Sequence, residues 1–359
     1  MRVIGIDPGT VTFDLCGLVD GRVFLDRSLS TADVLAEGSG LVALLAEAGP
    51  VDLIAGPSGY GLPLIDVRDV TEDDLRLAVL APEGEAGGIG GFRSLLRALA
   101  RIEGTMLLTP GVIHLASVPS YRKINRVDMG TADKLCAVVL ALHEQVAHSR
   151  GALEDVSFIL LELGGAFTAA VAVEAGRVVD GVGGTSGSIG MSSAGALDGE
   201  VAFLMGACTK DALFRGGVTS VAGVRDLAWP PATPTSRSRD AWSAYLEGAV
   251  KSIMAMTVSA PRAQEVLLSG RMATSEVRDE LASRLRGAAS AMTVRLLEGF
   301  GTTAKHAAQG AALMADGLAG GRAAPIVDRL GIREASGTVL DHLVVITPDA
   351  ARKRLGIHA

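Results

Sequence analysis

One pattern occurs twice in the sequence: an apolar strand ends in a glycine turn and is followed by a β-hairpin. The first copy has its strand at residues 3–6 and its turn at Asp7-Pro-Gly9-Thr10. The second has its strand at residues 158–163 and its turn at Gly164-Gly165. Two further apolar runs follow each turn, and Asp20-Gly21 between the first two is a strong hairpin signal. The pattern predicts one β-β-β unit in each half of the chain.

Helical signals and two more short strands separate and follow these units. The helical signals span residues 31–48, 95–102, 131–148, 241–260 and 304–318, and the additional strands are expected at residues 51–55 and 265–268. The mixture predicts an α/β fold.

The length of 359 residues suggests two domains, at about 100–200 residues per domain. We expect an N-terminal lobe at residues 1–150, which carries the first phosphate motif and the acceptor side. A C-terminal lobe is expected at residues 151–325, and residues 326–359 are expected to pack back on the N-terminal lobe.

Composition and charge exclude several classes of protein. The 33 basic and 40 acidic residues give no polycationic surface, so we expect no nucleic-acid partner. No run of 18 apolar residues and no secretory leader are present, so we expect no membrane association. The isolated Cys16, Cys136 and Cys208 indicate neither a disulfide framework nor a thiolate zinc site. We therefore expect a cytoplasmic protein.

Several familiar motifs fail on inspection. No Gly-Lys dipeptide exists, which excludes a Walker A loop, and residues 181–186 have serine in place of the last glycine of a dinucleotide fingerprint. His143 and His148 are five residues apart, which puts them about 140° apart on a helix and prevents them from sharing one metal ion.

The two glycine turns remain as candidates for ligand binding. Glycine lets backbone N–H groups approach a phosphate closely, Thr10 adds a hydroxyl donor, and Asp7 is suited to hold magnesium. An Asp-Pro-Gly sequence is also common in turns without any ligand. Glu162, Gly164 and Gly165 present the same chemistry in the second half. Two such turns, one per half, would clamp a polyphosphate between two lobes.

At this point the chain resembles the acetate and sugar kinase/Hsc70/actin superfamily. Its first and second phosphate motifs are similar to IGIDPGT and LELGGAFT, and its adenosine motif to EVLLSGR (residues 4–10, 161–168 and 265–271). Residues 128–133 and 310–312 fit its two connecting helices, so the resemblance covers residues 2–320. It implies a two-lobed actin-like ATPase fold of duplicated ribonuclease H-like domains, with ATP and Mg²⁺ in an inter-lobe cleft.

Within the superfamily the chain looks like the prokaryotic family labelled predicted butyrate kinases. The segments that carry this likeness are residues 57–61, 122–134 and 311–321. Two positions depart from the superfamily pattern. Glu162 stands where the second phosphate motif usually has aspartate, and Arg271 where the adenosine motif often has a second glycine. The resemblance therefore constrains the geometry of the metal site and the choice of nucleotide base less than it constrains nucleotide binding itself.

The resemblance assigns roles to individual residues. Asp7 and Glu162 would hold Mg²⁺. The nucleotide would be bound by residues of all three motifs: Asp7, Gly9, Thr10, Gly164, Gly165, Thr168, Gly270 and Arg271.

The acceptor side is open between two chemistries. For an alcohol acceptor, Asp128 is the candidate base; the alternative is a helix N-cap. For a carboxylate acceptor no base is needed, and Arg122, Lys123 and Arg126 would act as charge clamps, or form a solvated loop face. Ser58 and Tyr60 would line the acceptor pocket, or belong only to a Pro-Gly turn.

Three functions fit these features. The first is an ATP-dependent kinase that transfers the γ-phosphoryl group to a small carboxylate or alcohol. The second is a related ATP-dependent acyl- or carbamoyl-transfer enzyme. The third is a nucleotide-binding regulatory or assembly protein with little turnover. Ala/Gly-rich helices in the second half would support a homodimer.

Overall fold

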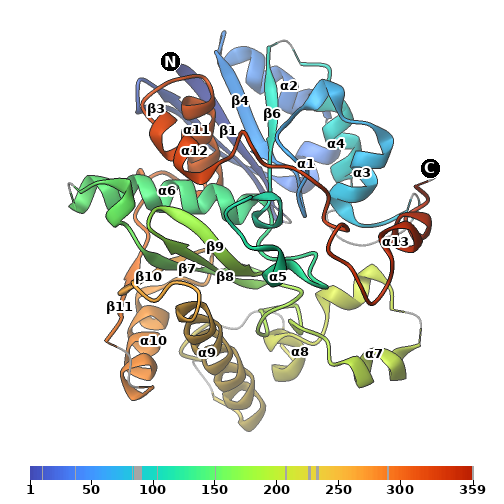
Figure 1. The fold of residues 1–359 in the computed structure, drawn as a ribbon, viewed down its shortest axis with the longest axis vertical. Coiled ribbons are helices and arrows are strands. Elements are labelled where there is room, and N and C mark those ends of the chain that lie inside the picture. The colour runs from blue at the N-terminus through green and yellow to red at the C-terminus, as the bar shows by residue number, and fades with distance from the viewer. Residues whose placement is uncertain are drawn as a thin grey trace. The chain divides into compact units, whose positions relative to one another are not determined.

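The computed structural model divides into two compact units (Figure 1). It describes all residues except 10, 37, 83, 85–90, 103, 150, 207, 225–227, 232–233, 289–290 and 358–359. Unit 1 consists of Met1–Val127, Thr131–Leu153 and Glu298–Ala359, and unit 2 of Asp128–Gly130 and Glu154–Leu297. Residues 298–325, which we expected in the C-terminal lobe, thus lie in unit 1, together with residues 326–359.

Unit 1 contains a six-stranded sheet with the order β3-β2-β1-β4-β6-β5. Its strands are β1 (Arg2–Pro8), β2 (Thr12–Val19), β3 (Arg22–Ser30), β4 (Leu53–Pro57), β5 (Ile65–Asp66) and β6 (Met106–Thr109). β1, β4 and β6 are parallel, and β2 and β3 extend the sheet as an antiparallel hairpin. Asp20 and Gly21 have φ of 50° and 79°, the left-handed pair that a tight hairpin turn requires, as the Asp-Gly sequence predicts.

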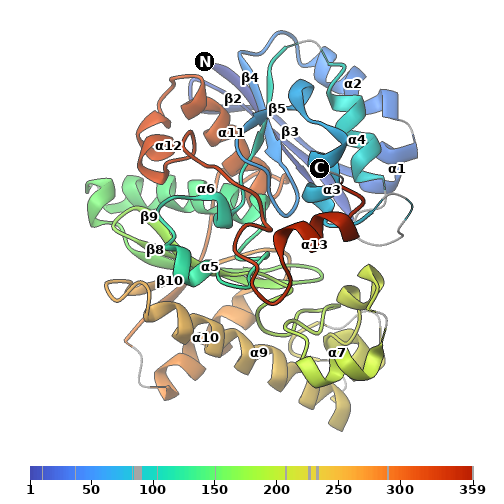
Figure 2. The same ribbon diagram turned by 45° about the vertical axis from the view of Figure 1, so that its right-hand side comes forward.

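Helices cover both faces of this sheet (Figure 2). On one face lie α6 (Ala132–Ser149), α11 (His306–Leu318) and α12 (Ala324–Leu330), and on the other α1 (Thr31–Ala36), α2 (Gly38–Glu47), α3 (Glu72–Val79) and α4 (Phe92–Leu99). Unit 1 also contains the short helices α5 (Ser120–Lys123) and α13 (Pro348–Arg354).

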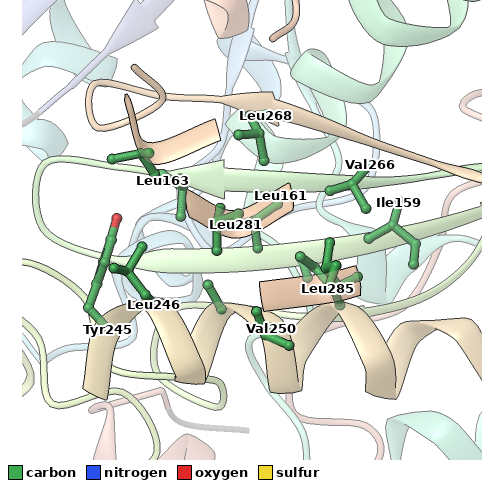
Figure 3. Close-up of a cluster of buried hydrophobic side chains, with 14 of the residues drawn as sticks. Ile159, Leu161, Leu163, Tyr245, Leu246, Val250, Val266, Leu268, Leu281 and Leu285 are labelled. Atoms are coloured by element: carbon green, nitrogen blue, oxygen red, sulfur yellow. The ribbon is translucent and has the colours of Figure 1, made fainter. Parts of the chain in front are cut away.

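Unit 2 contains a five-stranded sheet with the order β11-β10-β7-β8-β9. Its strands are β7 (Phe158–Leu163), β8 (Thr168–Glu174), β9 (Arg177–Val182), β10 (Glu265–Ser269) and β11 (Thr293–Leu296), and its helices are α7 (Gly199–Met205), α8 (Val218–Ala222), α9 (Ser236–Thr257) and α10 (Ser275–Gly287). α9 and α10 pack on one face of the sheet, where Leu161, Leu246 and Leu281 belong to a fully buried apolar core (Figure 3). No helix in the described ranges has the length and apolar character to cross a membrane.

The two sheets repeat one topology. The order β3-β2-β1-β4-β6 in unit 1 corresponds to β9-β8-β7-β10-β11 in unit 2. In both, a first strand carries an antiparallel hairpin on one side and two parallel strands on the other. This confirms the repeated β-β-β unit and extends it by two strands in each half.

Helix α11 packs unusually close to its neighbours in unit 1. Residues 308–318 are all buried. A Cβ on Gly5 of β1 would lie 2.1 Å from the backbone nitrogen of Ala312, and one on Gly310 would lie 1.8 Å from the carbonyl oxygen of Cys136 on α6. Glycine at these two positions is therefore required by backbone-to-backbone contact.

We expect Gly5→Ala to destabilise the protein by about 3 kcal/mol, because the obstructing atoms belong to the backbone of α11 and cannot rotate away. Denaturant unfolding measures the change. Gly199→Ala is the matched control, since nothing lies within 4 Å of its added Cβ. A Gly5→Ala protein as stable as the control would contradict the close packing of β1 on α11.

Candidate active site

The two predicted phosphate turns are closed by the same backbone hydrogen bond. In unit 1 the N–H of Gly9 donates to the carbonyl of Thr12 at 3.0 Å. In unit 2 the N–H of Gly164 donates to the carbonyl of Phe167 at 2.9 Å, again three residues ahead. Each turn joins the first strand of its sheet to the hairpin. Thr10, predicted to donate from the first turn, lies outside the described residues.

Asp7 lies at the end of β1, buried beside a second aspartate. The strand register sets Asp7 directly opposite Asp14 of β2. Burial, and next the negative charge of Asp133, raise the pKa of Asp7 to about 7, whereas Lys305 opposes this rise. Asp14 is itself buried, and one of its oxygens accepts a hydrogen bond from the Thr12 hydroxyl at 2.8 Å. The first turn thus carries two buried carboxylates where the sequence analysis named one.

Lys305 is the residue of this site that the sequence analysis missed. Its Nζ lies 2.8 Å from Oδ2 of Asp14 and 3.8 Å from Oδ2 of Asp7, and it donates to the carbonyl of Thr12 at 3.0 Å. A Cβ on Gly9 would lie 2.4 Å from this Nζ, so the ammonium group covers the turn. Lys305 lies just before α11 and almost 300 residues from the turn in the sequence. No local sequence pattern therefore indicates that it belongs to this site.

In unit 2 the structure brings together three predicted nucleotide residues and the predicted metal ligand Glu162. Gly270 follows β10 with φ of 96°, and an added Cβ would lie 2.6 Å from Oε1 of Glu162 and 2.5 Å from the carbonyl of Leu163. The exposed Arg271 lies against the second turn, with its Cδ 3.6 Å from the Cβ position of Gly165. The end of β10 therefore lies next to the end of β7. Gly270 lies at this point of contact, and no other residue could replace it without strain.

Thr168 also lies in unit 2, at the start of β8. It is buried, and its hydroxyl donates to the carbonyl of Ile189 at 3.3 Å. This contact ties the strand to the segment after β9, which gives Thr168 a structural partner near the second turn.

The carboxylates of the two turns suit magnesium held partly by a nucleotide. Mg²⁺ takes oxygen ligands and is usually bound by one or two carboxylates together with substrate phosphates and water. In the described parts of the chain, no cluster of three or more His, Cys, Asp or Glu side chains could hold a metal ion alone. The carboxylates of Asp7 in unit 1 and of Glu162 in unit 2 each offer oxygen ligands of this kind on their own turn.

Asp128 of unit 2 is the centre of a hydrogen-bonded loop. Its Oδ2 accepts from both the backbone N–H and the hydroxyl of Thr185, each at 3.0 Å, and its Oδ1 accepts from the N–H of Gly130 at 3.2 Å. Its carbonyl accepts from the hydroxyl of Ser186 at 2.6 Å. A Cβ on Gly183 would overlap the carboxylate. Asp128 thus fixes the glycine-rich loop after β9, and it is not the N-cap of α6, which begins at Ala132.

The three basic candidates of unit 1 occupy different environments. Lys123 is buried and donates from Nζ to the carbonyl of Leu115 at 2.9 Å, and burial lowers its pKa. The guanidinium carbon of Arg122 lies 5.5 Å from the centre of the Tyr121 ring. Arg126 is exposed. Lys123 is therefore bound within the interior, whereas Arg122 is partly exposed and Arg126 is exposed to solvent.

Ser58 holds a turn together, as its alternative interpretation predicts. Its buried hydroxyl donates to the carbonyl of Thr109 at 2.7 Å and accepts from the N–H of Leu62 at 2.8 Å. The backbone N–H of Tyr60 donates to the carbonyl of Ala78 at 3.0 Å. Gly61 ends this turn with φ of 128° against the ring of His114.

Comparison with known proteins identifies a family. Residues 5–345 match the family described as "Protein of unknown function (DUF1464)". The chain belongs to this family. No curated protein matches the chain.

Solved structures of two-lobed kinases share the fold. A propionate kinase from Francisella tularensis subsp. tularensis SCHU S4 is 11% identical with a TM-score of 0.62, over 87% of this chain and 98% of that one. Porphyromonas gingivalis acetate kinase is 12% identical with a TM-score of 0.60, over 86% and 98%. Acetate kinase from Entamoeba histolytica is 10% identical with a TM-score of 0.59, over 80% and 87%. These likenesses confirm the predicted fold class.

The burial of His114, which packs against Gly61, leads us to expect that the stability of the folded protein depends on pH. Neither ring nitrogen has a hydrogen-bond partner among the described residues, and burial lowers its pKa to about 4. An unfolded histidine takes up its proton near pH 6.5, so folding is increasingly opposed as pH falls from about 6.5 to about 4. The contribution reaches about 3 kcal/mol across this window.

Denaturant unfolding at pH 7.5 and pH 5 measures this effect. The wild-type protein is expected to lose more stability than His114→Leu over the same interval, because leucine does not titrate. Equal losses in the two proteins would show that His114 is not buried in its neutral form.

Proposed function

We propose that the protein is an ATP-dependent phosphotransferase that acts on a small carboxylate. One observation carries the proposal: two turns with the same hydrogen bond end corresponding strands of two sheets with the same order, and each has a carboxylate beside it. These carboxylates are Asp7 in unit 1 and Glu162 in unit 2. Duplicated turns with paired acids suit a polyphosphate and its metal ion.

The second turn has donors suited to phosphate oxygens. The N–H groups of Gly165 and Ala166 make no hydrogen bond within the described residues, and the exposed Arg271 lies beside them. In the first turn the N–H of Gly9 is used to close the turn, and Lys305 supplies the positive charge. Phosphoryl transfer depends on such positioning and on neutralising charge over the phosphoryl group. Bound Mg²⁺ would add to that neutralisation at Asp7 and Glu162.

The environment of Asp128 favours a carboxylate over an alcohol acceptor. An alcohol needs a base, and most of the acceptor capacity of Asp128 is taken by the loop, because Oδ2 accepts two hydrogen bonds from Thr185 and Oδ1 one from Gly130. A carboxylate is ionised and needs none. Arg122 and Arg126 are the candidates to orient it. The acetate and propionate kinases of the same fold, and the resemblance to predicted butyrate kinases, support this choice.

The direct test is ATP turnover with a panel of acceptors. The protein is incubated with ATP, Mg²⁺ and either short-chain carboxylates, including acetate, propionate and butyrate, or small alcohols, and ADP is measured. Hydroxylamine trapping identifies an acyl phosphate product. We expect ADP formation that depends on a carboxylate and is lost in Asp7→Asn. Nucleotide binding without acceptor-dependent ADP formation would instead favour a regulatory or assembly protein. Acyl transfer without a trapped acyl phosphate would favour an acyl- or carbamoyl-transfer enzyme.

The role of Asp128 is separable by two substitutions. We expect Asp128→Asn and Thr185→Val to lower stability and turnover together, because both weaken the same loop. Turnover with the best acceptor and denaturant unfolding are measured for each. If Asp128→Asn abolishes turnover at unchanged stability while Thr185→Val remains active, Asp128 is a base and the alcohol acceptor is favoured.

A further inference from the structure

The register of β1 and β2 in unit 1 sets two buried carboxyl groups opposite each other. Asp7 and Asp14 are directly opposite across the two antiparallel strands, so their side chains share one face of the hairpin. Asp14 is only 1% exposed, and its Oδ1 has no hydrogen-bond partner within the described residues. Two opposed carboxylates destabilise a sheet unless a cation lies between them.

Lys305 is the cation that the structure places there. Its Nζ contacts Oδ2 of Asp14 at 2.8 Å and Oδ2 of Asp7 at 3.8 Å. The same ammonium group covers Gly9, which has no side chain to prevent the approach. The Lys305 side chain is 43% exposed, so it can leave this position without unpacking the core.

The loop before α11 holds Lys305 in place. Asp26 of β3 accepts hydrogen bonds from the N–H groups of Thr303 and Ala304 at 2.9 and 2.8 Å, and from the Thr303 hydroxyl at 2.9 Å. The buried Gln309 donates from Nε2 to the carbonyl of Ala304 at 2.7 Å and accepts from the N–H of Phe300 at 2.8 Å. The backbone on the N-terminal side of Lys305 is therefore fixed on two sides, and only its side chain is free to move.

We propose that Lys305 is a tethered counter-ion of the Asp7–Asp14 pair that a divalent metal ion replaces, which frees its ammonium group for a phosphate oxygen. The proposal rests on the proposed function for the identity of the phosphate. It adds Asp14 to the metal-binding carboxylates and makes Lys305 a phosphate-positioning residue. No covalent bond forms or breaks in this exchange.

A metal ion and the ammonium group of Lys305 compete for the Asp7–Asp14 pair because both are positively charged. The two cations repel each other strongly at such separation. Lys305 therefore weakens the binding of metal alone. It does not weaken the metal–nucleotide complex to the same extent, because the phosphates give the displaced ammonium group a new partner.

The test is binding of Mn²⁺ alone, without nucleotide, followed by electron paramagnetic resonance. We expect Lys305→Met to bind Mn²⁺ about tenfold more tightly than the wild-type protein, and Lys305→Arg to resemble the wild type. Lys251→Met is the matched control, because Lys251 forms only an exposed pair with Glu247 on α9. Asp14→Asn in the Lys305→Met background should abolish the gain.

Two further measurements keep the proposal falsifiable. Circular dichroism verifies folding, and if Lys305→Met does not fold, Lys305→Gln replaces it. Binding of ADP at saturating Mg²⁺ should weaken about tenfold in Lys305→Met and not in Lys251→Met, since the phosphate loses the ammonium partner that the metal ion has displaced from the aspartates. Unchanged Mn²⁺ affinity in the folded Lys305 variant overturns the proposal. Because the Mn²⁺ measurement needs no acceptor and no turnover, its outcome is independent of whether the protein is a phosphotransferase.

Discussion

The burial of α11 is the constraint on which the candidate site of unit 1 depends. This helix lies between β1 and α6 at distances that only glycine permits, at Gly5 on one side and Gly310 on the other. Because Asp7 is the second-last residue of β1 and α11 is preceded by Lys305, fixing the helix against the strand also fixes the lysine over the turn. Backbone contact without side chains is rigid, since no rotamer change relieves it. The position of a charged group is thus set by apolar packing.

Duplication explains the shared features of the two glycine turns and not the differences in the residues around them. Both sheets have the same strand order, and both turns close with the same hydrogen bond. In unit 1 the turn borders an aspartate pair and Lys305, whereas in unit 2 it borders Glu162 and Arg271. The cations come from different elements, one before a helix and one after a strand. The common scaffold thus places a basic side chain at each turn by a different route.

Local sequence patterns predicted what depends on neighbouring residues. The strands β1 to β4 and β7 to β10, the Asp20-Gly21 turn and the long helices α6, α9 and α11 follow from periodicity and turn chemistry, whereas β5, β6 and β11 were not predicted. The single predicted helix at residues 31–48 is instead two helices, α1 and α2. The shorter or more polar α3, α7, α8, α10 and α12 were not anticipated, because tertiary contacts stabilise them more than their own periodicity.

Distant contacts account for what was missed at the site. Thr185, which donates two hydrogen bonds to Asp128, lies 57 residues away in the sequence, and Thr12, which accepts from Lys305, lies almost 300 residues away. The pairing of Asp7 with Asp14 is different, because it follows from the hairpin register alone. A buried carboxylate pair bridged by one lysine contributes little to the stability of the fold, since replacing such groups by apolar residues of similar size often leaves the stability unchanged or raises it. Its presence at a glycine turn, beside a loop that fixes the lysine backbone, is therefore better explained by ligand exchange than by folding.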